Sequence, residues 1–302
     1  MSNIPIQPFQ FPGLKTAQPL FIKREDLIHP VISGNKFWKL KYNLQRAKEL
    51  GKNTLITFGG AMSNHIVATA AAGKENGFKT IGIIRGEEIA DKWQDNLSLK
   101  EASKSGMEFY FVQRGEYRLK EKSEYIRSFL SLISDYYLVP EGGTNELAVK
   151  GAAEILNEDT SDFDIITTAM GTGGTLSGLS VGAKPHQHII GFPALKNAQF
   201  LVKEILKLTD KENFTVNLDN YFGGYAKVTS ELIDFINDFY LLNNIPLDPV
   251  YTGKMIFGLR EMIRKGEISS DKRILAIHTG GLQGIREMNK RLKQQNKQII
   301  IT

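Results

Sequence analysis

The sequence repeats one local pattern, in which a short apolar run leads through a glycine-containing turn into a helix-forming segment. The first clear example is residues 54–58, followed by Gly59-Gly60 and by an alanine-rich segment that runs from Ser63 to about Gly73. The same pattern predicts strands at residues 80–84, 108–112, 136–139, 165–169, 189–192 and 274–277. Helices are expected at residues 36–50, 96–105, 119–134, 145–157, 198–208 and 230–242, and near 176 and 254. Strands that alternate with helices are joined by crossover connections, so the sequence predicts parallel sheets.

The length of the chain indicates more than one such unit, because 302 residues exceed the usual size of a single domain. We expect an α/β fold of two open, mostly parallel twisted sheets flanked by helices. A larger domain of residues 1–40 and 142–302 would face a smaller domain of residues 41–141. Ligands of such sheets bind beyond the carboxyl ends of the strands, where the glycine-rich turns of this sequence lie. The cleft between the domains is therefore the expected binding site.

Composition excludes several kinds of site. The chain has no cysteine, which excludes disulfides, thiolate catalysis and metal centres held by cysteine. None of its five histidines has the HExxH spacing, so we expect no metal site. Residues 1–13 lack a basic segment and a continuous apolar run, and no stretch reaches the length of a membrane span. We therefore expect a cytoplasmic protein with no membrane partner.

The net charge of +5 is compatible with a nucleic-acid partner. The positive residues are spread along the chain, however, and the densest run, residues 290–297, is the tail of a further helix expected at the C-terminus. Basic side chains are favoured there by the helix dipole and face solvent. We therefore expect no nucleic-acid partner.

Lys36 occupies an unusual place at the start of a helix. Phe37, Leu40, Leu44 and Ala47 recur at helical spacing, which puts Lys36 in the first turn. The positive end of the helix dipole disfavours an ammonium group and lowers its pKa, as a nucleophilic lysine requires. The alternative is an ordinary solvated lysine on the surface.

The segment Gly171-Thr172-Gly173-Gly174-Thr175 lies between an expected strand and an expected helix. Its backbone N–H groups and hydroxyls can converge on an anion at the helix N-terminus, which predicts a phosphate site. The segment is not the GxGxxG dinucleotide fingerprint, because Leu176 stands where the last glycine would be, and no lysine follows to make a P-loop. A tight turn without a ligand is the alternative.

A third polar cluster, Gly60-Ala61-Met62-Ser63-Asn64-His65, follows the strand expected at residues 54–58. Ser63 or Asn64 can contact a ligand, but either can also serve only as a helix N-cap. A single histidine such as His65 at a helix start is more often structural than an acid–base group. Together, a helix-start lysine, a separate phosphate site and glycine-lined strand ends describe a pocket for a phosphorylated aldehyde bound to a lysine, and pyridoxal 5'-phosphate is such a cofactor.

Six motifs in order resemble those of the 1-aminocyclopropane-1-carboxylate deaminase/D-cysteine desulfhydrase family, which belongs to the tryptophan-synthase-β-like, fold-type II pyridoxal phosphate enzymes. In sequence order they are Lys23-Arg24-Glu25-Asp26 with Ser33-Gly34-Asn35-Lys36, segment 60–65, Pro140-Glu141-Gly142-Gly143-Thr144-Asn145, segment 171–175, Leu247-Asp248-Pro249-Val250-Tyr251-Thr252-Gly253-Lys254 and His278-Thr279-Gly280-Gly281. The resemblance covers about residues 5–285. It implies pyridoxal phosphate in the cleft between the domains, a small amino acid as substrate and a homodimer.

The resemblance also assigns roles to individual residues. Lys36 would carry the cofactor and move the substrate proton. Asn64 would bind the phenolic oxygen of the cofactor, and Gly171, Thr172, Gly173, Gly174 and Thr175 would hold its phosphate. Ser63 would lie beside the carboxylate of the substrate.

In the C-terminal motifs, Tyr251 would pack against the cofactor ring, Tyr225 would be a second active-site tyrosine, and Thr279 would face the pyridine nitrogen. Two positions depart from the family pattern. Family members usually carry glutamine where this chain has Met62. Family deaminases carry a glutamate directly after the tyrosine of the motif at residues 247–254, where this chain has Thr252.

We therefore expect a pyridoxal-phosphate-dependent lyase that performs β-elimination on a small amino acid, in the manner of D-cysteine desulfhydrase, and releases a 2-oxo acid and ammonia. One alternative is a 1-aminocyclopropane-1-carboxylate deaminase. Another is a β-replacement enzyme similar to cysteine synthases, although those lack the contexts of Tyr225 and Tyr251. A non-catalytic protein that binds pyridoxal phosphate or a nucleotide is an alternative of a different class, and a nucleotide binder has no use for Lys36.

Overall fold

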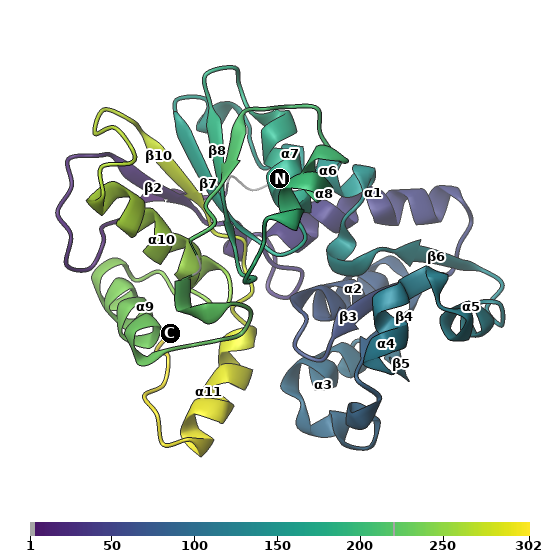
Figure 1. Cartoon of the computed structure of the whole chain (residues 1–302). Helices are drawn as coiled ribbons and strands as arrows, with labels where there is room; N and C mark the ends of the chain where they lie inside the picture. The colour runs from purple at the N-terminus through teal and green to yellow at the C-terminus, as the bar shows by residue number, and fades with distance from the viewer. Residues whose placement is uncertain (1–3, 220) are drawn as a thin grey trace.

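The computed structural model describes residues 4–219 and 221–302, which form two open sheets side by side (Figure 1). The larger sheet has six strands, in the order β1 (Ile6–Pro8), β2 (Leu20–Lys23), β10 (Ile274–Ile277), β7 (Ile165–Met170), β8 (His188–Pro193) and β9 (Phe214–Val216). The smaller sheet has four strands, in the order β5 (Met107–Val112), β4 (Lys79–Arg85), β3 (Thr54–Gly60) and β6 (Tyr136–Val139). Every pair is parallel except β1 with β2, so the predicted fold class is confirmed.

The central strands β10, β7 and β8 of the larger sheet are buried on both faces, as is typical of parallel sheets covered by helices on each side. Strand β10 shows the alternation: Ile274 and Ala276 pack into one core, and Leu275 and Ile277 into the other. The helices that supply the first core are α9 (Ser230–Asn243), α10 (Thr252–Arg264) and α11 (Gly284–Gln294). Those that supply the second are α1 (Asn35–Glu49), α6 (Glu146–Ala153), α7 (Gly174–Gly182) and α8 (Phe200–Leu206), with Ala198 just before α8.

Helices also cover both faces of the smaller sheet. Ile66 and Leu99 pack against Ile84 on one face, and Ile126 packs with Ile83 on the other. The first face carries α2 (Asn64–Asn76) and α3 (Leu97–Lys104), and the second carries α4 (Arg114–Leu119) and α5 (Glu124–Leu130). Short 3-10 turns complete the chain: η1 (Glu25–Leu27), η2 (Glu87–Asp95), η3 (Lys120–Lys122), η4 (Glu141–Gly143), η5 (Glu158–Thr160) and η6 (Tyr221–Gly223).

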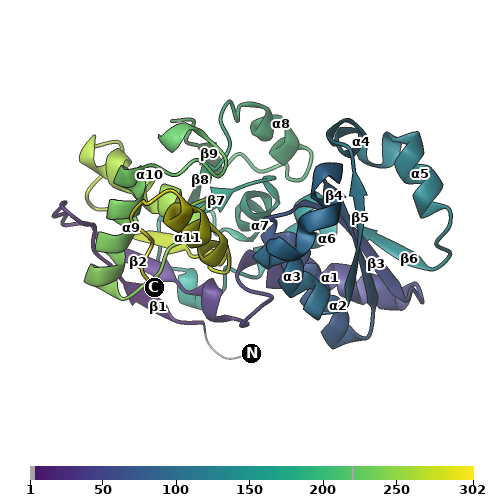
Figure 2. The same cartoon turned by 90° about the horizontal axis from the view of Figure 1, so that it is seen from below.

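The two sheets are also connected away from the strands. Figure 2 shows α11 beside α3, where the backbone N–H of Leu97 donates to Glu287 Oε2 at 3.1 Å. Among the described residues, no helix is long and apolar enough to cross a membrane. The domain boundaries proposed at residues 41 and 142 remain a prediction.

Three expectations about local structure were incomplete. The helix expected at residues 119–134 is instead divided, because Lys120 has a positive φ of 52° and Ser123 caps the separate helix α5. The helix expected at residues 198–208 is confined to Phe200–Leu206. Strands β1, β2 and β9 were not predicted: β1 and β9 have only three residues, and β2 was missed although it is as long as the predicted β6 and β10.

Candidate active site

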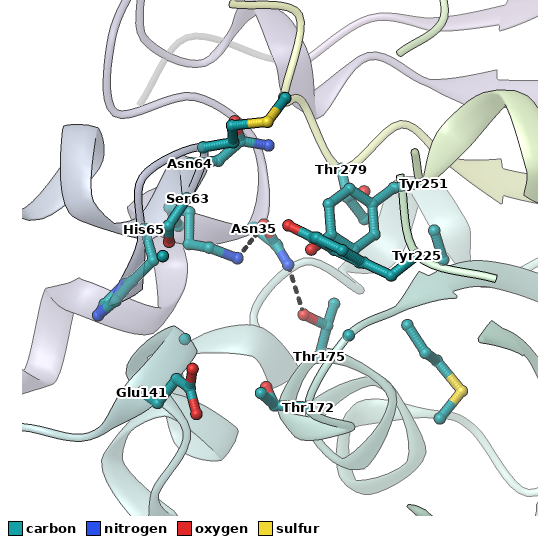
Figure 3. Close-up of a pocket in the computed structure, with 18 of the residues that line it drawn as sticks. Asn35, Ser63, Asn64, His65, Glu141, Thr172, Thr175, Tyr225, Tyr251 and Thr279 are labelled. Carbon is teal, nitrogen blue, oxygen red and sulfur yellow. Dashed lines mark hydrogen bonds between the residues drawn. The ribbon is translucent and has the colours of Figure 1, made fainter. Parts of the chain in front are cut away.

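One cavity of about 600 Å³ opens where the carboxyl ends of the two sheets meet. Figure 3 shows its walls, which carry side chains from both sheets. All the residues predicted from the sequence line it: Lys36, Ser63, Asn64, Gly171, Thr172, Gly173, Gly174, Thr175, Tyr225, Tyr251 and Thr279. The structure thus brings together six motifs that are far apart in the sequence.

Lys36 is the second residue of α1, and its side chain is partly buried in the cavity wall. Its Nζ donates to Asn35 Oδ1 at 3.2 Å, and Asn35 Nδ2 donates in turn to Thr175 Oγ1 at 2.7 Å. Burial lowers the pKa of Lys36 from 10.5 to about 8. The predicted direction of the shift is correct, but its main cause is the loss of water rather than the helix dipole.

The segment between β7 and α7 forms a cup that lines the cavity at the N-terminus of a helix, where an anion is favoured. Gly173 has a positive φ of 86° and precedes the N-terminus of α7. A Cβ on Gly174 would lie 2.9 Å from the Thr144 side chain and 3.1 Å from Lys39 Nζ, so glycine is needed for these two side chains to approach the backbone. The hydroxyls of Thr144 and Thr172 bond to each other at the same place. Backbone N–H groups at a helix start, hydroxyls and an ammonium are the donors that a phosphate requires.

Lys39 is a member of this site that sequence reasoning missed. Its side chain is 1% exposed, and its Nζ donates to Thr144 Oγ1 at 2.8 Å. Burial and the charge of Lys36 hold the pKa of Lys39 well below its usual range. No described carboxylate forms an ion pair with Lys39, and a buried ammonium without a counter-ion favours an anion beside it. The signal in the sequence was its spacing of three from Lys36, which puts both lysines on one side of α1.

The start of α2 forms the opposite wall. Ser63 Oγ accepts from the backbone N–H of Ile66 at 3.4 Å, so Ser63 is an N-cap as well as a cavity residue. Asn64 reaches the larger sheet, because a Cβ on Gly281 would lie 2.7 Å from Asn64 Nδ2. His65 points away from the cavity centre in Figure 3 and pairs with Thr57 Oγ1 through Nε2 at 2.8 Å.

His65 is a buried structural residue at the edge of this wall, with 2% of its surface exposed. Burial, together with the charges of Lys36 and Lys39, holds the pKa of His65 well below 6.5. The imidazole is therefore neutral at physiological pH, which agrees with the expectation that His65 is a structural residue rather than an acid–base group.

Two tyrosines face each other on the side of the larger sheet. The rings of Tyr225 and Tyr251 are 6.1 Å apart and inclined by 71°. Burial, followed by the effect of Tyr225, holds the pKa of Tyr251 well above 10, so its hydroxyl stays protonated. Lys254 Nζ donates to the backbone oxygen of Gly224 at 2.5 Å and so holds the loop that carries Tyr225.

Asp248 fixes the start of α10, a role that sequence reasoning did not assign. Its carboxylate accepts from the backbone N–H groups of Val250, Tyr251 and Thr252 and from the Thr252 hydroxyl, at 2.8 to 2.9 Å. Thr252 is fully buried in this cap and does not line the cavity, whereas Thr279 does. The position after Tyr251 therefore presents no polar group to a ligand.

Comparison with known proteins gives consistent results. The family described as "Pyridoxal-phosphate dependent enzyme" matches residues 2–280. A Thermotoga maritima protein with a provisional name of 1-aminocyclopropane-1-carboxylate deaminase is 34% identical over 90% of this chain and 92% of its own length. The bifunctional D-cysteine desulfhydrase/1-aminocyclopropane-1-carboxylate deaminase of Arabidopsis thaliana is 31% identical over 93% of this chain and 77% of its own. A crystal structure of an ACC deaminase homologue superposes with a TM-score of 0.78 at 30% identity, covering 96% of this chain and 93% of that one.

Proposed function

Because the chain belongs to the pyridoxal-phosphate-dependent enzymes, and among them to the 1-aminocyclopropane-1-carboxylate deaminase/D-cysteine desulfhydrase family, we propose that it performs β-elimination on D-cysteine or a related β-substituted D-amino acid. The products would be a 2-oxo acid, ammonia and the departing β-substituent. The cofactor of the family is pyridoxal phosphate. The family resemblance also supports a homodimer, and the lack of a signal-like or membrane-spanning segment in the sequence supports a cytoplasmic location.

The donor groups of the cavity fit this cofactor. We assign the phosphate to the cup at residues 171–175, where the buried ammonium of Lys39 lacks a counter-ion among the described residues. Asn64 is assigned to the phenolic oxygen, and Tyr251 to the face of the ring. The hydroxyl of Thr279 is assigned to the pyridine nitrogen.

When bound, pyridoxal phosphate supplies an electron sink that stabilises negative charge on the α-carbon of the substrate. The chain itself must remove the α-proton, and Lys36 is the candidate base. A pKa of about 8 leaves roughly one amine in ten neutral at pH 7, against about one in three thousand for an ordinary lysine. We assign the carboxylate of the substrate to Ser63, because Ser63 is the N-cap of α2 and the positive end of the helix dipole favours an anion there.

The observation that carries the choice of reaction is that no free carboxylate is found among the described residues that line the cavity. Among the described residues that line the cavity, Glu141 is the one acidic side chain, and it already accepts from the Tyr117 hydroxyl and pairs with Lys120 at 3.0 Å. A hydroxyl such as that of Thr279 stabilises a protonated ring nitrogen far less than a carboxylate does. The weaker electron sink suffices for loss of a good leaving group, but not for opening an unactivated cyclopropane ring.

The experiment is an assay of 2-oxo acid release by the purified holoprotein. We expect pyruvate from D-cysteine and little or no 2-oxobutyrate from 1-aminocyclopropane-1-carboxylate. The second candidate function is 1-aminocyclopropane-1-carboxylate deaminase. The name of the Thermotoga relative favours it, and it is one of the two activities in the name of the Arabidopsis relative. Clear 2-oxobutyrate formation with D-cysteine inert would establish the deaminase and overturn the proposal.

A further inference from the structure

Arg85 lies at the edge of the cavity on the smaller sheet. It is the last residue of β4, and its register partner is Gly60, the last residue of β3. A Cβ on Gly60 would lie 3.3 Å from Arg85 Nη2, so the guanidinium lies directly against the strand end from which the Ser63 loop begins. Arg85 is exposed and lines the cavity, so a ligand can reach it.

The neighbouring cations already have acidic partners. They are Arg114 with Glu88 at 2.6 Å, Lys120 with Glu141 at 3.0 Å, and Arg291 with Glu287 at 4.0 Å. Arg85 differs from them, because no carboxylate of the described residues lies within 4.0 Å of its guanidinium. It contacts an aromatic ring instead, since its guanidinium carbon lies 5.7 Å from the ring centre of Tyr117.

The surroundings of Arg85 leave one positive charge unbalanced. Tyr117 also contacts Lys120, whose Nζ is 3.4 Å from the ring centre, and donates its hydroxyl to Glu141. After burial, the charge of Glu141 is the largest cause that raises the pKa of Tyr117, and the positive charge of Arg85 opposes it. Two cations thus share one carboxylate here, and that carboxylate is already bonded to Tyr117 and Lys120.

This surplus charge comes from the smaller sheet, whereas the phosphate cup belongs to the larger sheet. The cup follows β7 of the larger sheet and has its own ammonium, that of Lys39. Arg85 belongs to the smaller sheet and borders the Ser63 loop, the side to which the substrate is assigned. An anion at Arg85 would therefore belong to the substrate and not to the cofactor.

We propose that Arg85 forms a subsite for an acidic group on the side chain of the substrate. The proposal rests on the assignment of the Ser63 loop to the substrate under the proposed function. The preferred ligands are amino acids that carry a second oxyanion in addition to the α-carboxylate. A guanidinium suits this role because its planar N–H groups bind two oxygens of an oxyanion at once. Because Arg85 is exposed to solvent, salt should weaken its interaction with the oxyanion.

Binding of aspartate and asparagine to the holoprotein tests this subsite, because the two ligands have nearly the same shape and differ in side-chain charge. Affinities for the D- and L-forms would be measured by isothermal titration calorimetry on the wild type, Arg85→Gln and the control Arg127→Gln. Arg127 is exposed on α5 and does not line the cavity. For whichever enantiomer binds, we expect the affinity of the wild type for aspartate to be about tenfold higher than its affinity for asparagine. The preference should disappear in Arg85→Gln and persist in Arg127→Gln.

Two outcomes would overturn the subsite. Equal affinity of the wild type for acid and amide would show that Arg85 selects no side-chain charge. Equal weakening of both ligands in Arg85→Gln would place the guanidinium on the α-carboxylate instead. Failure of D-cysteine to yield pyruvate would overturn the proposed elimination, but the difference in affinity would still be measurable, so the two failures are distinct.

Discussion

Gly34 and Thr279 touch through their backbones, so closely that a Cβ on Gly34 would lie 2.0 Å from the backbone oxygen of Thr279. The same oxygen accepts the backbone N–H of Asn35 at 3.4 Å. Gly34 also has a positive φ of 64°, which side-chain-bearing residues rarely adopt. The contact joins the end of β10 to the start of α1 and thereby fixes Lys36 relative to Thr279.

Replacing Gly34 with alanine should destabilise the protein by about 2–5 kcal/mol, because the methyl group must push apart two backbone segments in addition to the cost of positive φ. Gly51 is the matched control, since it has the same φ of 64° but nothing within 4 Å of the place that a Cβ would occupy. Gly51→Ala should cost only about 1–2 kcal/mol. Urea unfolding of both variants measures the difference, and equal losses would show that the close contact contributes nothing.

Replacing Gly174 with alanine should weaken pyridoxal phosphate binding by about tenfold, because the methyl group would displace the Thr144 and Lys39 side chains that border the cup. Gly173 is a less clean position, since a side chain there would also be strained by the positive φ of 86°. Titration of the apo-protein with the cofactor gives the affinity. The control is Gly115→Ala in α4, where nothing lies within 4 Å. Unchanged affinity in Gly174→Ala would remove the cup from the cofactor site.

Part of this site could be predicted from signals that are local in the sequence. The helix that follows Lys36 and the position of segment 171–175 between a strand and a helix made both candidates, and the family resemblance supplied the remaining site residues. The parallel sheets then bring such segments to one edge, as observed.

The remaining features depend on contacts between distant segments, which no local pattern encodes. Lys39 looks like an ordinary helical lysine until Thr144 and Gly174 are folded against it. The unpaired state of Arg85 depends on which acidic residues the fold assigns to its neighbours. The break of the helix expected at residues 119–134 depends on the positive φ of Lys120, which sequence periodicity does not reveal.

The depressed pKa of Lys36 predicts how cofactor attachment depends on pH. Only the neutral amine attacks the aldehyde, and its fraction rises with pH through the pKa. With a pKa of about 8, the rate at which the apo-protein takes up pyridoxal phosphate should increase about tenfold between pH 7 and 9 and then level off. An ordinary lysine would give an increase of about a hundredfold over that range. Stopped-flow absorbance separates the two cases, and a rate still rising steeply above pH 9 would contradict the shift.

The account depends most on Lys36 as the residue that carries the cofactor, and Lys39 provides a demanding comparison. Both lysines lie within one turn of α1 and line the same cavity, and burial lowers the pKa of each. The direct measurement is borohydride reduction of the holoprotein, which fixes the cofactor to its lysine, followed by peptide mapping by mass spectrometry. We predict modification of Lys36 alone. Modification of Lys39 or of another lysine, with Lys36 unmodified, would contradict the assignment.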